Sequence, residues 1–253
     1  MNEFNYLITV DRIPEQLNNC SLKQNFTACA VTLIWQKNPE QTQITTNGAE
    51  GRKSVLNQHM LDVTIGFENK LSTTKWEKII IYECTTNECN HFNQIKRLLN
   101  SLTIIDELDQ IKDIITPQEP FQGQWCEQGS NATFIECGTK IPDDKCKICS
   151  LGVERNQTGI EFCATCLTEN DGDNFLSRSV MINMIDRTRT DVWQLQCRSN
   201  KCNSLSNGEL IRQKAQIDFD FVKFFNNGHR LISFVSMNIM FLIYMVFMIE
   251  FHC

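Results

Sequence analysis

Two stretches of the chain, 79–90 (IIIYECTTNECN) and 192–203 (VWQLQCRSNKCN), end in the same pattern and decide the fold. Each is a run of mostly apolar residues followed by Cys, four residues, Cys and Asn. The first cysteines of the two patterns, Cys84 and Cys197, are 113 positions apart. Self-similarity at a fixed spacing is typical of a duplicated structural unit. The chain is therefore expected to contain two copies of one domain.

The start of the unit is repeated as well. Cys20 and Cys126 each begin the pattern C-x4-N-x-T, and a further cysteine follows, Cys29 in the first copy and Cys137 in the second. Repeat symmetry therefore suggests the disulfides Cys20–Cys29 and Cys126–Cys137. The expected segments are an N-terminal segment (1–18), a first repeat (19–90), a helical linker (91–123), a second repeat (124–203), a juxtamembrane segment (204–230), a membrane helix (231–249) and a short tail (250–253).

Inside each repeat the apolar segments are short, rich in β-branched and aromatic residues, and separated by polar stretches, which is typical of antiparallel strands. The expected strands include 28–35, 61–67, 76–84, 159–163 and 179–185. After the first C-x4-C-N ending, apolar residues recur every three or four positions from Phe92 to Ile115, and Pro117 follows. This period predicts a helix of about 20 residues between the repeats. A weaker version of the pattern covers 209–225.

The chain contains 13 cysteines, which is too many for incidental packing. A reducing cytosol would leave them only metal or redox chemistry, so we expect oxidised cysteines in an exported protein. Twelve of them precede the apolar C-terminal run and can form six disulfides: Cys20, Cys29, Cys84, Cys89, Cys126, Cys137, Cys146, Cys149, Cys163, Cys166, Cys197 and Cys202. The four cysteines between 146 and 166 allow three connectivities among themselves, and the sequence does not choose between them.

Those four cysteines also have an alternative interpretation. Cys146 and Cys149 form one CxxC pair, and Cys163 and Cys166 form a second one 13 residues later. Two such pairs at this spacing resemble a structural zinc site with four thiolate ligands. Against zinc, the triplet Asn156-Gln157-Thr158 lies between the pairs, and the first repeat has no counterpart. Disulfides are therefore the main prediction, and zinc is the alternative cofactor.

The apolar run 231–249 predicts a membrane helix, because 19 residues at about 1.5 Å each come close to the ~30 Å hydrocarbon core of a bilayer. A single span is expected, and a GPI anchor is the second choice. The N-terminus shows no basic and apolar leader, so the sequence is expected either to begin inside a longer secreted chain or to belong to a tail-anchored protein.

Three Asn-x-Ser/Thr triplets predict N-glycosylation, at Asn25, Asn131 and Asn156. Asn25 and Asn131 stand at the same offset from a cysteine in the two repeats. A duplicated position makes a chance origin of these two triplets less plausible. They are therefore expected on surface turns of an exported protein.

Charge and motifs exclude several classes of function. The net charge of −6 opposes binding to a phosphate backbone, so nucleic acid is not an expected partner. Residues 1–228 contain only His59 and His91, and they have neither a G-x-S-x-G nor an H-E-x-x-H motif. The acidic group at 106–109 and the triplet Asp171-Gly172-Asp173 do not have the spacing of a calcium loop, and they are interpreted as a solvated helix face and a turn. No catalytic residue is predicted.

The C-x4-C-N endings resemble those of the three-finger family of urokinase-receptor-like and lymphocyte-antigen-type domains. The resemblance implies that Cys84 pairs with Cys89, and Cys197 with Cys202, to close a small loop. It also implies that the asparagine after each loop, Asn90 or Asn203, hydrogen-bonds back to the core of its domain. Paired cysteines usually stand before this loop in the family, and here glutamate or glutamine occupies those places.

The expected fold is mainly β with linking helices: two small disulfide-stabilised antiparallel β domains, three-finger-like, followed by a C-terminal transmembrane helix. The expected function is that of a single-pass plasma-membrane protein whose extracellular domains recognise or adhere to a protein or glycan ligand without catalysis. The alternative is a tail-anchored intracellular scaffold that binds zinc through Cys146, Cys149, Cys163 and Cys166.

Overall fold

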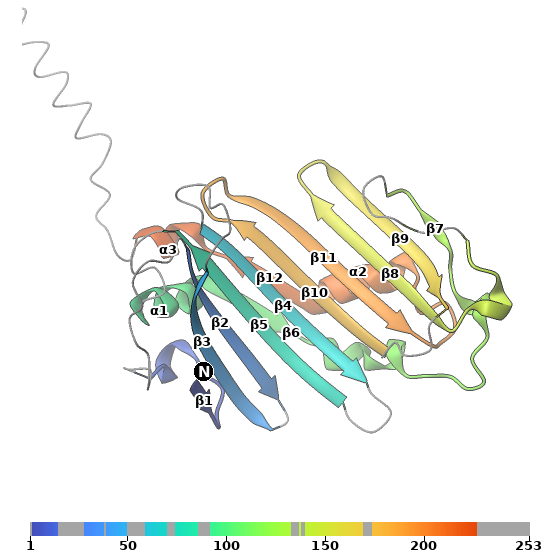
Figure 1. Ribbon diagram of the computed structural model, residues 1–253, viewed down its shortest axis with the longest axis horizontal. Helices are drawn as coiled ribbons and strands as arrows, with labels where there is room; N and C mark the ends of the chain where they lie inside the picture. The colour runs from blue at the N-terminus through green and yellow to red at the C-terminus, as the bar shows by residue number, and fades with distance from the viewer. Residues whose placement is uncertain are drawn as a thin grey trace, which may run out of the picture.

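A computed structural model describes residues 2–14, 28–37, 39–49, 59–69, 74–85, 92–132, 137, 140–168 and 174–226. Ten of its strands form one antiparallel sheet in the order β1-β3-β2-β5-β4-β10-β11-β8-β9-β7 (Figure 1). These strands are β1 (Asn2–Phe4), β2 (Ala28–Lys37), β3 (Glu40–Ala49), β4 (His59–Asn69), β5 (Thr74–Cys84), β7 (Gly129–Ser130), β8 (Ile148–Asn156), β9 (Gly159–Leu167), β10 (Asn174–Asn183) and β11 (Thr188–Cys197). The prediction of a mainly antiparallel β fold is confirmed.

A second layer covers one face of this sheet. Its centre is a two-stranded ribbon of β6 (Leu102–Asp106) and β12 (Ala215–Phe219). Three α-helices accompany the ribbon: α1 (Phe92–Ser101), α2 (Leu205–Lys214) and α3 (Phe221–Asn226). Short 3-10 helices complete the described part of the chain: η1 (Val10–Arg12), η2 (Leu108–Ile115), η3 (Gly123–Trp125) and η4 (Asp143–Lys145).

The two repeats join in the middle of the sheet. The first repeat contributes the order β3-β2-β5-β4, and the second contributes β10-β11-β8-β9, which is the same arrangement reversed. β4 and β10 occupy the same place in their repeats and pair antiparallel, and the Thr64 and Ser179 hydroxyls meet across this junction at 2.7 Å. The expectation of two separate small β domains is therefore wrong, because the repeats share one sheet and one core.

The repeated unit is also longer than the sequence suggested. α1 and α2 begin 113 positions apart, at Phe92 and Leu205, and β6 and β12 begin 113 positions apart, at Leu102 and Ala215. The segments expected to be a linker (91–123) and a juxtamembrane connection (204–230) therefore contain a helix and the last strand of each repeat. β6 and β12 then pair with each other, which ties the two repeats together a second time.

The prediction of one helix of about 20 residues after the first repeat is wrong. The helix α1 ends at Ser101, the strand β6 follows, and η2 completes the segment. β6 reads LTIID, in which β-branched residues favour an extended backbone, and the neighbouring strand β12 satisfies its hydrogen-bonding groups. An apolar period of three or four positions therefore spans three different elements.

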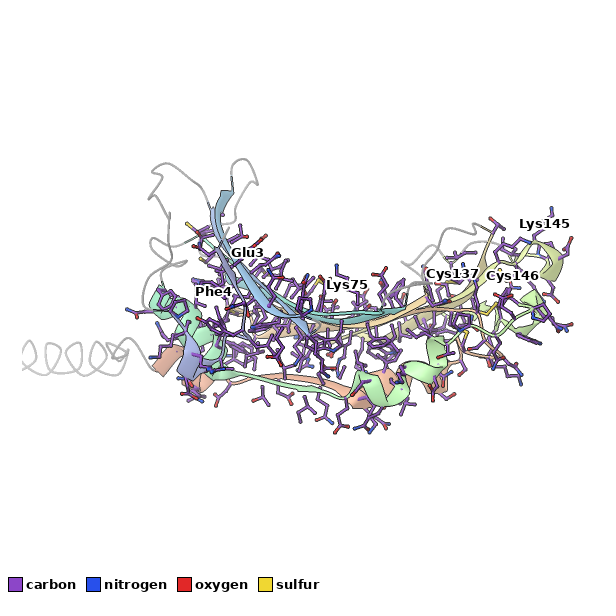
Figure 2. All side chains as sticks on the ribbon, turned by 90° about the horizontal axis from the view of Figure 1, so that it is seen from below. Glu3, Phe4, Lys75, Cys137, Lys145 and Cys146 are labelled. Carbon is purple, nitrogen blue, oxygen red and sulfur yellow. A yellow bond between two sulfur atoms is a disulfide. The ribbon has the colours of Figure 1, made fainter. Side chains whose placement is uncertain are left out.

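Side chains alternate between the two faces of the sheet. In β4, Leu61, Val63 and Ile65 are fully buried under the second layer, whereas Asp62 and Thr64 lie on the other face and are only partly buried. Figure 2 shows the sheet as a curved layer with α1, α2 and α3 on its convex side, and the described residues form no second layer on its concave side. The main core lies between the sheet and the helices.

The predicted membrane helix, 231–249, lies outside the described residues. Within the described part of the chain, none of the helices combines the length and the apolar composition that crossing a bilayer requires.

Candidate functional site

A polar cleft of about 410 Å³ opens between the second half of the sheet and the segment formed by α2 and β12. We call it the arginine cleft because four arginines line it, together with two aspartates, two glutamines and one isoleucine: Arg155, Arg178, Arg189, Asp191, Arg212, Gln213, Gln216, Ile217 and Asp218. Strands β8, β10 and β11 form its floor, and α2 and β12 form its other wall. A smaller groove of about 240 Å³ lies on the uncovered face of the sheet, beside Gly66 and Phe175.

Arg178 is the most deeply buried charged side chain of the cleft. It occupies a core position of β10 between Leu176 and Val180, and its side chain is 5% exposed. One terminal nitrogen of its guanidinium donates to the backbone carbonyls of Arg212 and Ala215, and the other donates to Asp191. Arg178 therefore fastens the end of α2 and the start of β12 to the sheet.

Asp191 lies between two guanidinium groups. Arg189 donates to it from Nε at 2.7 Å and from Nη2 at 2.9 Å, and Arg178 binds it from the other side. Burial acts to raise the pKa of Asp191, but the hydrogen bonds and the charges of Arg189 and Arg178 together outweigh burial and hold this pKa below its ordinary value. Asp191 therefore stays ionised at neutral pH.

The outer part of the cleft is more accessible. Arg212 donates to the Glu209 carboxylate from both Nε and Nη2, and this contact is the main cause that lowers the pKa of Glu209 to about 2. The Arg155 guanidinium stacks 5.7 Å from the centre of the Trp193 ring and has no hydrogen-bond partner among the described residues. Arg155 therefore has all of its donors available for a ligand.

The charges of the cleft favour an anion. Its four guanidinium groups face two carboxylates, those of Asp191 and Asp218, so the lining carries a net charge of +2 in a chain whose total is −6. Guanidinium groups bind carboxylate, sulfate and phosphate through paired hydrogen bonds. The lining contains amide, carboxylate and guanidinium groups, and these suit binding and orientation of a ligand.

Sequence reasoning did not find this cleft, although a signal was present. In the run Leu176, Arg178, Val180, Ile182 an arginine occupies one of the alternating apolar positions of a strand. A charge at a core position needs a buried partner. The partner, Asp191, stands on the next strand, but the sequence does not show that α2 and β12 return to cover both residues.

The cysteines of the second repeat are all oxidised. The pairs are Cys126–Cys149, Cys137–Cys163, Cys146–Cys166 and Cys197–Cys202. The pairing of Cys197 with Cys202 agrees with the expected one, but the suggested Cys126–Cys137 bond is wrong. The alternation of side chains explains this. Cys126 pairs with Cys149 on the covered face of the sheet, whereas Cys137 pairs with Cys163, which lies on the opposite face.

The cysteines of the first repeat differ. Cys84 is in a disulfide, whereas Cys29 carries a free thiol, so the expected pair Cys20–Cys29 is absent. Cys29 instead stands opposite Cys84 in the β2–β5 ladder. Cys20 and Cys89 lie outside the described residues, and so do Asn25 and Asn90.

The four cysteines of the alternative zinc site do not converge. Cys163 and Cys166 are three positions apart on β9 and therefore project to opposite faces of the sheet. The sulfur atoms that do approach one another are those of Cys126, Cys146 and Cys166, which lie within 4.8 Å of one another. All three are already bonded in disulfides. A zinc site built from the two CxxC pairs is therefore ruled out by the alternation of β9.

Asn203 lies buried in the centre of the second repeat. Its Oδ1 accepts from the backbone nitrogen of Glu127 at 2.9 Å, and its Nδ2 donates to the carbonyls of Glu127, Ser150 and Thr165. The residue after the Cys197–Cys202 loop therefore joins three segments that are far apart in the sequence. The role that the resemblance implied for Asn203 matches these contacts.

Two of the asparagines predicted to carry glycans, Asn131 and Asn156, lie among the described residues, and neither is buried. Asn156 ends β8, and its Oδ1 accepts hydrogen bonds from the Thr158 hydroxyl at 2.6 Å and from the Thr158 backbone nitrogen at 2.8 Å. Asn131 follows β7, where its Nδ2 donates to the Ile160 carbonyl. Asn156 therefore stands at an exposed hairpin turn, and Asn131 stands beside the edge of the sheet.

Comparison of the chain with protein-family models, with curated proteins and with solved structures finds no match.

Proposed function

We propose that the protein is a membrane-anchored, extracellular recognition or adhesion protein, and that its arginine cleft binds an anionic group on a protein or glycan ligand. The observation that carries this proposal is the gathering of four guanidinium groups from β8, β10, β11 and α2 around one open cleft of an acidic chain. Deeply buried Arg178 and Asp191 fix the floor, and Arg155 remains available at the surface.

The disulfides support the extracellular part of this proposal. Four of them cross-link the second repeat, and three of the four join segments that are 20 to 26 residues apart. Such bonds form and persist in oxidising compartments. They also restrict the unfolded chain, which is a common way to stabilise an exported domain. The apolar run 231–249 supports membrane anchoring.

The cleft also indicates how the ligand is recognised. A bound carboxylate or sulfate would meet the guanidinium of Arg155 first, because Arg178 is engaged with backbone carbonyls, Arg189 with Asp191 and Asp218, and Arg212 with Glu209. Arg189 and Arg212 are each about one third exposed, so their contribution is reduced by solvent and salt. Binding is therefore expected to weaken as ionic strength rises.

A pair of charge-neutralising variants tests the cleft. Arg155→Gln removes one positive charge inside it, and Lys140→Gln removes one from an exposed position outside it. The probe is a sulfated oligosaccharide, titrated calorimetrically into the full-length protein in detergent. We expect Arg155→Gln to weaken binding about tenfold, and Lys140→Gln to change it less than about twofold. Equal effects of the two variants would show that general charge, and not the cleft, binds the probe.

A gel tests the extracellular location. The protein from its native membrane is compared with and without reductant, and with and without enzymatic removal of N-glycans. We expect both treatments to change its mobility, because disulfides and N-glycans arise during export. Insensitivity to both treatments would support an intracellular protein instead.

A further inference from the structure

The short helix α3 presents apolar side chains to solvent at the end of the molecule that lies opposite β7 (Figure 1). Val222 is 62% exposed and Phe225 is 38% exposed. Phe224 of the same helix is instead buried, with only 3% of its surface exposed. One face of α3 is therefore part of the core, and the other face is apolar but uncovered.

The core contacts hold α3 in this orientation. The Phe224 ring packs edge-on against Tyr82, with ring centres 6.1 Å apart. Arg97 of α1 donates a hydrogen bond to the Phe224 carbonyl, and its guanidinium lies 5.3 Å from the centre of the Phe224 ring. Turning α3 to bury Val222 would break these contacts. The exposure of its outer face is therefore imposed by the fold.

A second element extends the apolar surface. The turn between β10 and β11 lies beside α3, since the Arg187 guanidinium is 5.6 Å from the centre of the Phe221 ring. Ile185 of the same turn is 49% exposed. We call Ile185, Val222 and Phe225 the apolar rim. Exposed apolar side chains on two elements that lie side by side mark a contact surface more often than isolated ones do.

The charges around the apolar rim balance. Arg187 and Lys223 are positive, and Asp186 and Asp220 are negative. Asp220 accepts a hydrogen bond from the backbone nitrogen of Lys223, and Asp186 accepts one from Asn183. A surface with this balance has no electrostatic preference for a strongly charged protein. Its favourable contact is the burial of apolar area.

We propose that the apolar rim rests in the interfacial region of the lipid bilayer and holds the folded domain against the membrane. This inference rests on the proposed membrane anchoring. Only residues 227–230 separate α3 from the apolar run 231–249, and four residues extend over at most about 14 Å. If 231–249 crosses the bilayer, α3 therefore lies at or near its surface. Exposed apolar side chains suit that position, and the long side chains of Arg187 and Lys223 can keep their charged groups in the headgroup layer.

Tryptophan scanning tests the contact in the full-length protein. Val222→Trp places a reporter on the apolar rim, and Leu205→Trp is the matched control. Leu205 is also exposed, at 43%, but it begins α2, so the rest of α2 and all of β12 lie between it and α3 along the chain. Both variants are inserted into phosphatidylcholine nanodiscs, and the emission of the unsubstituted protein is subtracted. Brominated phosphatidylcholine then quenches the fluorescence of only those tryptophan side chains that reach the lipid.

We expect quenching of the Val222→Trp signal to exceed that of Leu205→Trp by about threefold or more, with a blue-shifted emission. Equal quenching of the two variants in protein that stays in the nanodisc would overturn the inference and leave membrane anchoring intact. If alkaline carbonate strips the protein from vesicles, both the anchoring and the inference fail. The two failures are therefore distinguishable.

Discussion

Arg178 and Asp191 form an ion pair between β10 and β11 inside the protein, with side chains that are 5% and 10% exposed. Arg189 pairs with the same carboxylate, so the single negative charge of Asp191 is shared by two guanidinium groups. The pair is joined to the backbone of α2 and β12 through Arg178. The floor of the arginine cleft and the attachment of the second layer to the sheet therefore depend on the same buried contacts.

The two partners should not be equally sensitive to mutation. Asp191→Asn leaves the guanidinium groups of Arg178 and Arg189 without a full counter-charge, and we expect a loss of about 3–5 kcal/mol in the free energy of unfolding. Arg178→Met leaves Asp191 paired with Arg189 and should cost only about 1–3 kcal/mol. Urea denaturation at pH 7, with disulfides intact, measures both. A larger loss for Arg178→Met than for Asp191→Asn would contradict the proposal that Asp191 neutralises both Arg178 and Arg189.

The pKa of Asp191 also predicts an acid effect. Because this pKa lies below its ordinary value in the folded state, the ion pair stabilises the protein fully above the ordinary value, and the stabilisation is lost as pH falls through the folded pKa. Wild type should therefore lose stability below about pH 4, and Asp191→Asn should lose less over the same interval. Thermal denaturation between pH 2 and pH 7 provides the comparison, because this range includes the ordinary pKa of an aspartate, about 3.9. Parallel curves would refute the assignment.

Asp62 should behave in the opposite way. It lies on the uncovered face of the sheet, burial raises its pKa, and its Oδ1 is buried without a hydrogen-bond partner among the described residues. Its ionised form is therefore less favourable in the folded protein than in the unfolded chain. Asp62→Asn should raise the free energy of unfolding at pH 7 by about 1 kcal/mol, and the gain should vanish below about pH 3, where wild-type Asp62 is protonated. A gain that persists in acid would point to another cause.

Asn203 should be intolerant of substitution. Removing its side chain would leave the Glu127 backbone nitrogen and three carbonyl groups without this partner. Unsatisfied buried groups cost about 1–3 kcal/mol each, so Asn203→Ala should lower the free energy of unfolding by about 3 kcal/mol or more. Asn200→Ala is the control, because it removes an exposed amide of the preceding loop. Denaturant midpoints of the oxidised proteins would decide, and similar midpoints for both variants would contradict a central role for Asn203.

Two glycines provide a matched test of how α2 packs. A Cβ at Gly208 of α2 would stand 2.9 Å from both Leu151 Cδ2 and Trp193 Nε1, whereas a Cβ at Gly152 of β8 would meet nothing within 4 Å. Alanine favours a helix over glycine by about 1 kcal/mol, but overpacking costs about 1–3 kcal/mol. Gly208→Ala should therefore destabilise the protein, and it should also weaken binding in the arginine cleft by moving α2. Gly152→Ala should change neither the melting temperature nor the affinity, and a stabilised Gly208→Ala protein would show that α2 has room to spare.

The sequence predicted those features that depend on neighbouring residues. The short segments rich in β-branched residues identified strands such as β2, β4 and β5, and the loop of Cys197 and Cys202 needs only a five-residue separation. The period of three or four positions after Phe92 failed, because α1 and η2 bury apolar side chains in the same core that Leu102 and Ile104 of β6 pack against, while Ile105 is 43% exposed. A repeated period identifies most of the buried side chains, but it does not fix the backbone that carries them.

The sequence by itself determined that the chain is a duplicated, mainly antiparallel β protein with oxidised cysteines. The tertiary structure alone decided that the repeats merge through β4 and β10, that β6 pairs with β12, and which cysteines meet. These contacts join positions more than 20 residues apart, and in the two strand pairings more than 100 apart. The geometry of one strand dictates only which face a side chain takes, whereas its partner on that face is chosen when the whole chain closes around a shared core.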